Sequence, residues 1–266
     1  MLKVCGEIWD KVRTEQPLVH CISNYVTLND VANVIIASGA SPAMVEHPAE
    51  SGGFACLAKS VYFNLGTLTG EQEEAMLEAV KGAATAQVPV ILDPVACGVI
   101  PRKVEVIKKL KGQGKLTVLK GNWAEIKSLA GIETGARGVD SLDDGRGIET
   151  ACINLAQKEN LVVAATGEID VVSDGDRIAK IQNGTSLFEK ITGAGCMVGG
   201  VVAACTGAFP QDPWLASITA LCAFNIAGER AGSLSGDNPA YFRTVLIDQL
   251  YHLGDKDIMK EGKVEW

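Results

Sequence analysis

The chain has 266 residues, of which 47% are hydrophobic, and this length allows one large α/β domain or two small ones. Its 24 basic and 32 acidic side chains give a formal net charge of −8, and no basic block is long enough to neutralise a run of phosphates. We therefore expect no nucleic-acid partner and no attachment to an anionic membrane, and the composition favours a globular protein of enzyme size.

The N-terminal segment and the cysteines predict a protein of a reducing compartment. Residues 1–16 form an amphipathic, mixed-charge segment rather than a signal peptide. The eight cysteines include no C-x-x-C pair and no local histidine partner, so disulfides and zinc are disfavoured, and most of the thiols are expected to be buried. The longest apolar stretches fall short of the ~20 residues of a membrane span. We therefore expect a soluble, cytoplasmic protein.

The sequence contains five short β-rich runs. Each run is followed by a turn and then by a further segment, in most cases one with helical periodicity. The runs cover residues 17–23, 60–66, 88–94, 115–121 and 160–167. Because most of the intervening segments have helical periodicity, the alternation predicts an α/β fold in which helices cover both faces of a mostly parallel sheet.

Two helix starts can be read directly from the sequence. Thr27 and Asp30 resemble a capping box with Asp in place of Glu, and they predict a helix that stops at Gly39. Thr69 precedes a second helix over residues 70–87, whose acidic first turn complements the helix dipole.

Later in the chain the pattern changes. Asp174 and Gly175 lie between two β-rich runs and predict an antiparallel hairpin. From Thr192 onward the pattern is almost entirely helical. The sequence contains no Pro- or Ser-rich linker, no repeat of fixed period and no low-complexity tract, so we expect a single domain over residues 1–266.

Polar residues follow the predicted strands where a parallel sheet binds its ligands, beyond the carboxyl ends of the strands. The candidates are Asp93, the pair Asn122 and Glu125, Thr166, and the glycine loop of residues 193–196 that opens a helix. Each also has a purely structural interpretation, in turn initiation, helix capping, strand exit or close helix packing. Two carboxylates that can hold a hard cation, beside an anion-binding helix terminus, are typical of phosphoryl transfer from a metal–nucleotide complex. The sequence lacks the P-loop and dinucleotide-binding glycine patterns.

Taken in order, six blocks of the sequence resemble the hydroxyethylthiazole kinase family of the ribokinase-like superfamily. The first block and the glycine loop "TGAGCMVGG", which contains Cys196, are the specific ones. The resemblance implies a ribokinase-like fold, an ATP- and Mg²⁺-dependent kinase for 4-methyl-5-(2-hydroxyethyl)thiazole in thiamine synthesis and salvage, and a homotrimer whose active sites lie between subunits. The blocks are residues 17–50, 64–68, 91–95, 119–126, 166–175 and 192–200.

The resemblance also implies a role for each matching residue. Cys196 matches the residue that faces the reacting hydroxyl. Lys120 stands where the family more often has Arg, and a lysine binds phosphate as a point charge rather than through two parallel hydrogen bonds. The implied thiazole contacts are Asn24, Met44, Gly66 and Gly193; the ATP contacts are Lys120, Asn122 and Thr166; the metal residues are Asp93 and Glu125; and the anion hole is Gly193, Ala194, Gly195 and Cys196.

The sequence leaves the role of Cys196 open. A helix N-terminus lowers the pKa of a thiol, whereas an adjacent phosphate favours the neutral form. Our hypothesis is that Cys196 orients the alcohol and helps to remove its proton during in-line transfer of the γ-phosphoryl group of ATP.

Other functions fit parts of the same pattern. A ribokinase-like kinase of another small alcohol, such as hydroxymethylpyrimidine, would use the same loop and carboxylates. A cysteine-nucleophile acyl transferase or hydrolase would also place a thiol at a helix N-terminus, and it would need a histidine base nearby. His20 and His47 lie in the matched blocks, and each also has a structural interpretation. A nucleotide- or thiazole-binding module without turnover is the third alternative.

Overall fold

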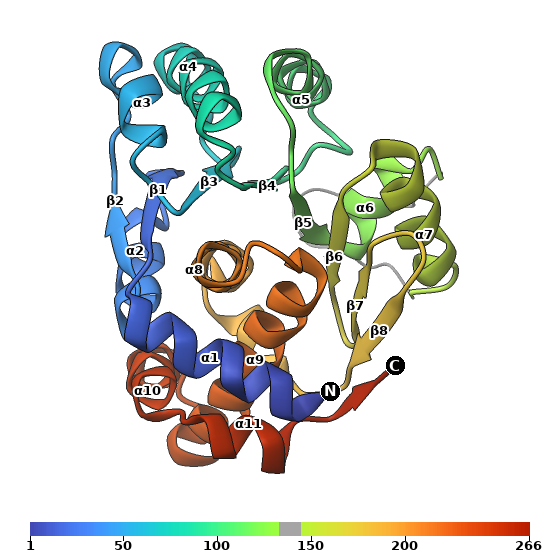
Figure 1. Cartoon of the computed structure of the whole chain (residues 1–266). Helices are drawn as coiled ribbons and strands as arrows, with labels where there is room; N and C mark the ends of the chain where they lie inside the picture. Colours follow the sequence, from blue (N-terminus) through green and yellow to red (C-terminus); the bar gives the residue numbers. More distant parts are fainter. Residues whose placement is uncertain (133–144) are drawn as a thin grey trace.

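The computed structural model describes residues 1–132 and 145–266, and within them a nine-stranded sheet runs through the middle of the molecule (Figure 1). The strand order is β2-β1-β3-β4-β5-β6-β7-β8-β9. Neighbouring strands from β2 to β6 are parallel, and the remaining pairs are antiparallel. The strands are β1 (Leu18–Ile22), β2 (Ser41–Ala43), β3 (Ser60–Asn64), β4 (Val90–Asp93), β5 (Val118–Asn122), β6 (Val162–Thr166), β7 (Asp170–Ser173), β8 (Ile178–Ile181) and β9 (Val264–Glu265).

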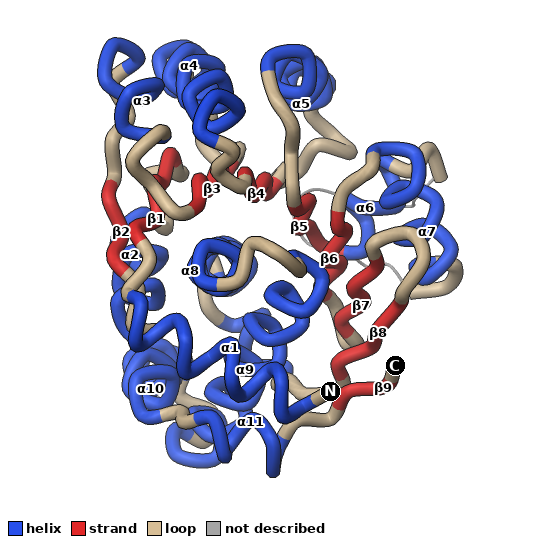
Figure 2. Tube along the Cα trace, in the orientation of Figure 1, coloured by secondary structure: helices blue, strands red, loops and turns tan. Residues whose placement is uncertain are grey.

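Helices cover both faces of the sheet, so the predicted α/β architecture is confirmed (Figures 1 and 2). One face carries α3 (Pro48–Ala55), α4 (Gly70–Ala86), α5 (Pro101–Gln113), α6 (Trp123–Leu129) and α7 (Ile148–Glu159). The other carries α1 (Leu2–Glu15), α2 (Leu28–Ala37), α8 (Ala194–Ala208), α9 (Pro213–Ser235), α10 (Pro239–His252) and α11 (Asp255–Glu261).

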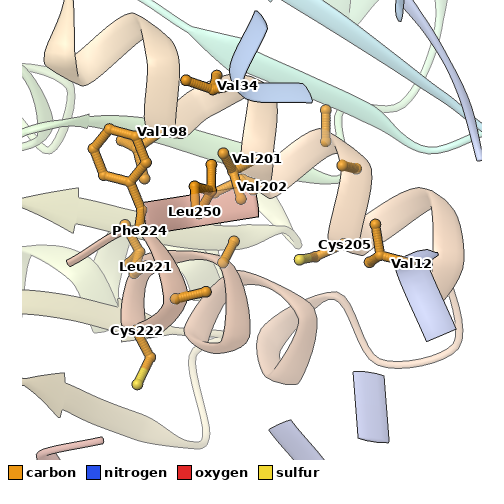
Figure 3. Packing of buried hydrophobic residues seen from close by; sticks show 14 of the residues in the cluster. Val12, Val34, Val198, Val201, Val202, Cys205, Leu221, Cys222, Phe224 and Leu250 are labelled. Carbon is orange, nitrogen blue, oxygen red and sulfur yellow. The ribbon is translucent and has the colours of Figure 1, made fainter. Parts of the chain in front are cut away.

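The helix α8 lies against the middle of the sheet and is apolar on all sides. Every residue from Met197 to Ala208 is buried. Figure 3 shows Val198 of α8 beside Phe224 of α9, in the larger of the two apolar clusters. Gly199 lets the helix approach β3 closely, because a Cβ atom there would lie 2.4 Å from the Tyr62 hydroxyl oxygen. This packing holds the N-terminus of α8 at the carboxyl ends of the parallel strands.

Two local predictions are confirmed. Thr69 caps α4 by accepting a hydrogen bond from the Gln72 backbone N–H at 3.1 Å, in a complete capping box. The hairpin joins β7 to β8, where the Asp174 carboxylate accepts the Arg177 backbone N–H at 2.7 Å and Gly175 adopts a φ of +99°.

The predicted capping box at the start of α2 is wrong. The helix does begin at Leu28, but the Thr27 side chain makes no capping hydrogen bond. The Asn24 amide oxygen accepts the Thr27 backbone N–H at 3.1 Å instead. Asp30 is drawn away by Arg243 of α10, whose Nε lies 3.0 Å from its carboxylate. The Asp30 side chain, which the sequence assigned to a local cap, therefore serves the packing of α2 against α10.

The cysteines are all free thiols, and most are buried, as predicted; Cys56 is exposed and Cys196 is half-buried. Among the described residues, no helix is both long and apolar enough to cross a bilayer.

Candidate active site

The carboxyl ends of the parallel strands meet the N-terminus of α8 at one edge of the sheet. Asp93 is the last residue of β4, and Lys120 lies in the neighbouring strand β5. The Lys120 ammonium is 3.3 Å from Asp93 Oδ2 and donates a hydrogen bond to the Gly195 carbonyl oxygen at 2.8 Å. The structure thus brings together one residue predicted for the metal, one predicted for ATP and the predicted anion-hole loop.

The Asp93–Lys120 pair is an ion pair of the protein interior, since each residue is only 2% exposed. Burial raises the pKa of Asp93, and the Lys120 ammonium acts in the opposite direction. Burial alone would lower the pKa of Lys120, but the attraction of the Asp93 and Glu125 carboxylates outweighs it and raises that pKa. Lys120 therefore keeps its charge and balances the buried acids beneath the glycine loop.

Two polar residues of β3 extend the site, and the sequence reasoning missed both. The Tyr62 hydroxyl donates to the Cys196 carbonyl oxygen at 2.9 Å and lies 3.3 Å from Asp93 Oδ2. The Asn64 amide donates to the Tyr62 hydroxyl at 3.0 Å. A signal was available, because Ser60, Tyr62 and Asn64 alternate with the apolar Val61 and Phe63 and therefore share one face.

Asn24, which the resemblance assigns to the thiazole, also holds the thiol. Its amide nitrogen donates to Asn64 Oδ1 at 2.8 Å and lies 3.4 Å from Cys196 Sγ. Its amide oxygen accepts the backbone N–H groups of Val26 and Thr27, both at 3.1 Å. The side chain thus fixes the loop between β1 and α2 and, at the same time, the position of the sulfur.

The electrostatic surroundings favour a neutral thiol at Cys196. Burial raises its pKa, the negative charge of Asp93 raises it further, and Lys120 only partly offsets these effects. The helix N-terminus therefore does not make this residue a thiolate at neutral pH.

Two glycines let the loops of the site approach one another. Gly193 has a φ of +83°, and a Cβ atom there would lie 2.2 Å from Thr27 Cγ2. A Cβ atom on Gly66 would lie 2.8 Å from that of Asn24. The backbone N–H of Gly66 also donates to Asn64 Oδ1 at 3.0 Å. The two predicted glycine contacts therefore lie on either side of the loop between β1 and α2.

Glu125 and Asn122 form the capping box that the structural interpretation predicts. The Glu125 backbone N–H donates to Asn122 Oδ1 at 2.9 Å, and Glu125 Oε2 accepts the Asn122 backbone N–H at 2.7 Å. The other carboxylate oxygen accepts the Ala96 backbone N–H at 2.7 Å. Burial raises the pKa of Glu125, and repulsion from Asp93 raises it further. Glu125 thus joins the turn after β4 to the start of α6, and its carboxylate remains close to that of Asp93.

Lys103 is a further buried cation that the sequence reasoning missed. It lies in the first turn of α5, and its ammonium donates to the carbonyl oxygens of Gly66 at 3.1 Å and Val95 at 2.6 Å. A lysine near a helix N-terminus opposes the helix dipole, and this was the available signal. The ammonium holds the turn after β3 against the turn after β4, beside Glu125.

The remaining predicted residues lie around this centre. Met44 follows the edge strand β2, is partly buried, and packs against the same apolar cluster as Cys196. Thr166 ends β6, and its hydroxyl donates to the Gly121 carbonyl oxygen at 3.3 Å.

The histidines of the matched blocks have structural partners. The His20 ring nitrogen Nε2 is 2.8 Å from the Val45 carbonyl oxygen, and burial lowers its pKa. The His47 ring accepts the Ala49 backbone N–H at the start of α3. Neither ring is a hydrogen-bond partner of Cys196 in the described part of the chain.

The geometry can be compared with known proteins. The profile of the hydroxyethylthiazole kinase family matches residues 9–256. The chain belongs to this family. It is 64% identical over 266 residues to the hydroxyethylthiazole kinase of Syntrophomonas wolfei subsp. wolfei, covering 100% of both chains. It is 49% identical over 256 residues to the hydroxyethylthiazole kinase of Clostridium novyi, covering 96% of each.

Solved structures agree with the family and the fold. The hydroxyethylthiazole kinase protein from Pyrococcus horikoshii OT3 superposes with a TM-score of 0.90 at 35% identity, over 99% of this chain and 98% of that one. A ribokinase-like superfamily protein from Enterococcus faecalis V583 superposes with a TM-score of 0.63 at 11% identity, over 93% of this chain and 95% of that one, and it shows the fold alone. The predicted family and the ribokinase-like fold are confirmed.

Proposed function

We propose that the chain transfers the γ-phosphoryl group of ATP to the hydroxyl of 4-methyl-5-(2-hydroxyethyl)thiazole, and that residues 1–266 form one catalytic domain. The observation that carries the proposal is the position of Cys196. It stands at the N-terminus of α8, its sulfur is 3.4 Å from the Asn24 amide nitrogen, and its carbonyl group is tied to the Asp93 cluster through Tyr62. A reacting hydroxyl and a developing phosphoryl charge need this combination of groups.

In the proposed reaction, the alcohol oxygen attacks the γ-phosphorus. A new P–O bond forms, the bond from the γ-phosphorus to the bridging oxygen breaks, and ADP leaves. The loop of residues 193–196 supplies backbone N–H groups of a helix start, which stabilise the transferring group. Lys120 lies directly beneath this loop and adds positive charge from the sheet. Because the transition state is loose, positioning contributes most of the rate.

We propose that Cys196 accepts the proton that the alcohol loses. As a neutral thiol, Cys196 takes the alcohol proton on its sulfur while its own proton passes to a phosphoryl oxygen. The Asn24 amide keeps the sulfur in place for this exchange. Met44 covers the thiazole ring through its thioether, which suits an aromatic face.

Asp93 and Glu125 are the residues that would hold the divalent metal, which we propose to be Mg²⁺. Their buried carboxylates repel one another, and a cation beside them would relieve that repulsion. Within residues 1–132 and 145–266, no group of three or more His, Cys, Asp or Glu could hold a metal by itself. Mg²⁺ commonly takes one or two carboxylates and completes its shell with water and substrate phosphates, so this donor set fits it. A metal held there would supply positive charge that offsets the negative charge of the ATP phosphates.

We further propose a homotrimer with active sites between subunits. Tyr25 and Val26 lie next to Asn24 in the sequence and are 60% and 64% exposed. Met44 follows β2, which is an edge strand. Exposed apolar side chains at the rim of a site favour cover by a second copy of the chain. Light scattering should give three times the chain mass, and Val26→Asp should dissociate the assembly and reduce turnover.

The test of the function is ADP formation with ATP and Mg²⁺ on three acceptors: the thiazole alcohol, hydroxymethylpyrimidine and water. We expect turnover on the thiazole alcohol well above both other rates. Turnover on hydroxymethylpyrimidine alone would reassign the substrate, and no ADP with either alcohol would indicate a binding module. Rapid alkylation of Cys196 together with ester hydrolysis would support the acyl-transfer alternative, although Cys196 is paired with Asn24 and not with a histidine.

A further inference from the structure

A buried carboxylate lies under the turn that follows β6. Asp170 is the first residue of β7 and is 5% exposed. Its Oδ1 atom accepts the Gly167 backbone N–H at 3.0 Å, and its Oδ2 atom accepts the Asn225 side-chain amide at 2.8 Å. One oxygen therefore holds the turn, and the other is anchored to α9.

The opposite side of the same turn is held by an indole. Trp123 lies at the start of α6, and its Nε1–H donates to the Ile169 carbonyl oxygen at 3.1 Å. A Cβ atom on Gly167 would lie 2.2 Å from the Trp123 ring, so the backbone is in contact with the indole. Residues 167–169 are thus fixed between a carboxylate and an aromatic ring.

The polar network continues from Asn225 to Asn183, in the segment that follows β8. The Asn225 amide also donates to the Asn183 carbonyl oxygen at 2.9 Å. The Asn183 side chain accepts the Lys263 backbone N–H at 2.7 Å and donates to Glu229 Oε2 at 3.2 Å. From Asn183 the chain runs through the short helix η1 (Ser186–Lys190) to the loop at residues 193–196. The network therefore connects the turn after β6 with the segment that leads into the proposed anion hole.

A carboxylate at residue 170 costs more free energy to bury than an apolar side chain that would fill the same space. A buried ionised carboxylate is costly unless it is well hydrogen-bonded. Both groups that face Asp170, the Gly167 N–H and the Asn225 NH₂, are donors, and an asparagine of the same shape would turn one N–H against a donor. The charged side chain that acts on Asp170 is Lys120 on β5, which favours the ionised form. A buried carboxylate that is costly to keep, at a turn beside the candidate site, indicates a functional requirement for Asp170.

We infer that Asp170, anchored by Asn225, is a positioning residue for nucleotide binding, because it holds the turn after Thr166 in the conformation that meets ATP. The inference rests on the proposed function insofar as it assigns this turn to the nucleotide. It adds a residue that touches neither substrate and acts through the backbone of Gly167.

The test is equilibrium binding of a non-hydrolysable ATP analogue with Mg²⁺, measured by calorimetry for the wild-type chain, Asp170→Asn and Ser173→Ala. Ser173 is the matched control, since it is also buried on β7 but bonds Gly175 and Arg177 at the far end of the strand. We expect the Kd of Asp170→Asn to rise about tenfold and that of Ser173→Ala to change less than about twofold. In turnover assays, the KM for ATP should rise while the KM for the thiazole alcohol stays constant.

A folded Asp170→Asn variant with an unchanged Kd would overturn the inference, and so would an equal loss in Ser173→Ala. If Asp170→Asn does not fold, Asn225→Ala replaces it, with an expected rise in Kd of about threefold or more, and an unchanged Kd there overturns the inference. Failure of the proposed function is distinguishable: a wild-type chain that binds the analogue but does not phosphorylate the thiazole alcohol refutes the substrate and leaves the binding comparison intact. A wild-type chain that does not bind the analogue overturns the inference.

Discussion

The contact between Gly193 and Thr27 gives a quantitative prediction for Gly193→Ala. The φ of +83° would strain an alanine by about 1–2 kcal/mol. In addition, its Cβ would lie 2.2 Å from Thr27 Cγ2, whereas carbon atoms pack no closer than about 3.5 Å, so the loop must move by about 1 Å. A displacement of that size at a reacting group lowers the rate by about 100-fold.

The matched control is Gly131→Ala. Gly131 follows the C-terminal end of α6, away from Asn122, and has a φ of +79°. Among the described residues, a Cβ atom there would meet nothing within 4 Å. Gly131→Ala should lose about 1–2 kcal/mol of unfolding free energy in urea through backbone strain alone. Gly193→Ala should lose at least as much, because it carries the same strain and also the contact with Thr27. Only Gly193→Ala should lose kcat/KM for the thiazole alcohol. The reasoning is refuted if the two variants have kcat/KM values within about threefold of each other.

Four further predictions concern single residues. Cys196→Ala, assayed at saturating ATP, should lower kcat by ~10²-fold to 10⁴-fold, and retention of a tenth of the activity would contradict its proton role. Glu73→Gln should cost about 1 kcal/mol at pH 7 and progressively less at acidic pH, because Lys109 lowers the pKa of Glu73 in the folded state and this stability is lost as the pH falls through that pKa. Burial raises the pKa of Asp170 to about 6, so its ionised form destabilises the fold at pH 7. The stability difference between the wild type and Asp170→Asn should therefore shift in favour of the wild type by about 2 kcal/mol as the pH falls from 7 to 4. Gln87→Gly should stabilise the chain by about 1 kcal/mol in urea, because Gln87 ends α4 with a φ of +57°, and no change would contradict the strain.

The strands and helices that repeat along the chain were predictable because each carries its own periodic signal. The edge strands were not. β2 has three residues and β9 has two, and each exists only because its backbone pairs with a neighbouring strand. The short range of sequence patterns also explains the error at Thr27. Its predicted partner Asp30 pairs instead with Arg243, which is 213 residues away in the sequence. A pattern of neighbouring residues cannot predict a partner at that separation.

The residues of the candidate site also fall into two groups, those that local sequence patterns predict and those that they do not. Asp93, the pair Asn122 and Glu125, and the glycine loop were predictable because they stand at strand ends and helix starts, which the sequence marks. Tyr62 and Lys103 were missed because their importance lies in partners from distant loops, such as the Cys196 carbonyl group and the Gly66 carbonyl group. The roles assigned to ATP, metal and thiazole contacts stay predictions until the substitutions above are measured.

The surroundings of Cys196 explain why a thiol suits this position. Asp93 and Glu125 already place two carboxylates at the carboxyl edge of the sheet. The negative charge of Asp93 raises the pKa of the Cys196 thiol. The triphosphate of ATP would add further negative charge beside that thiol. A carboxylate at residue 196 would be a stronger base but would add its own charge against the γ-phosphate. A neutral thiol held by Asn24 adds none, and a loose transition state needs little base strength.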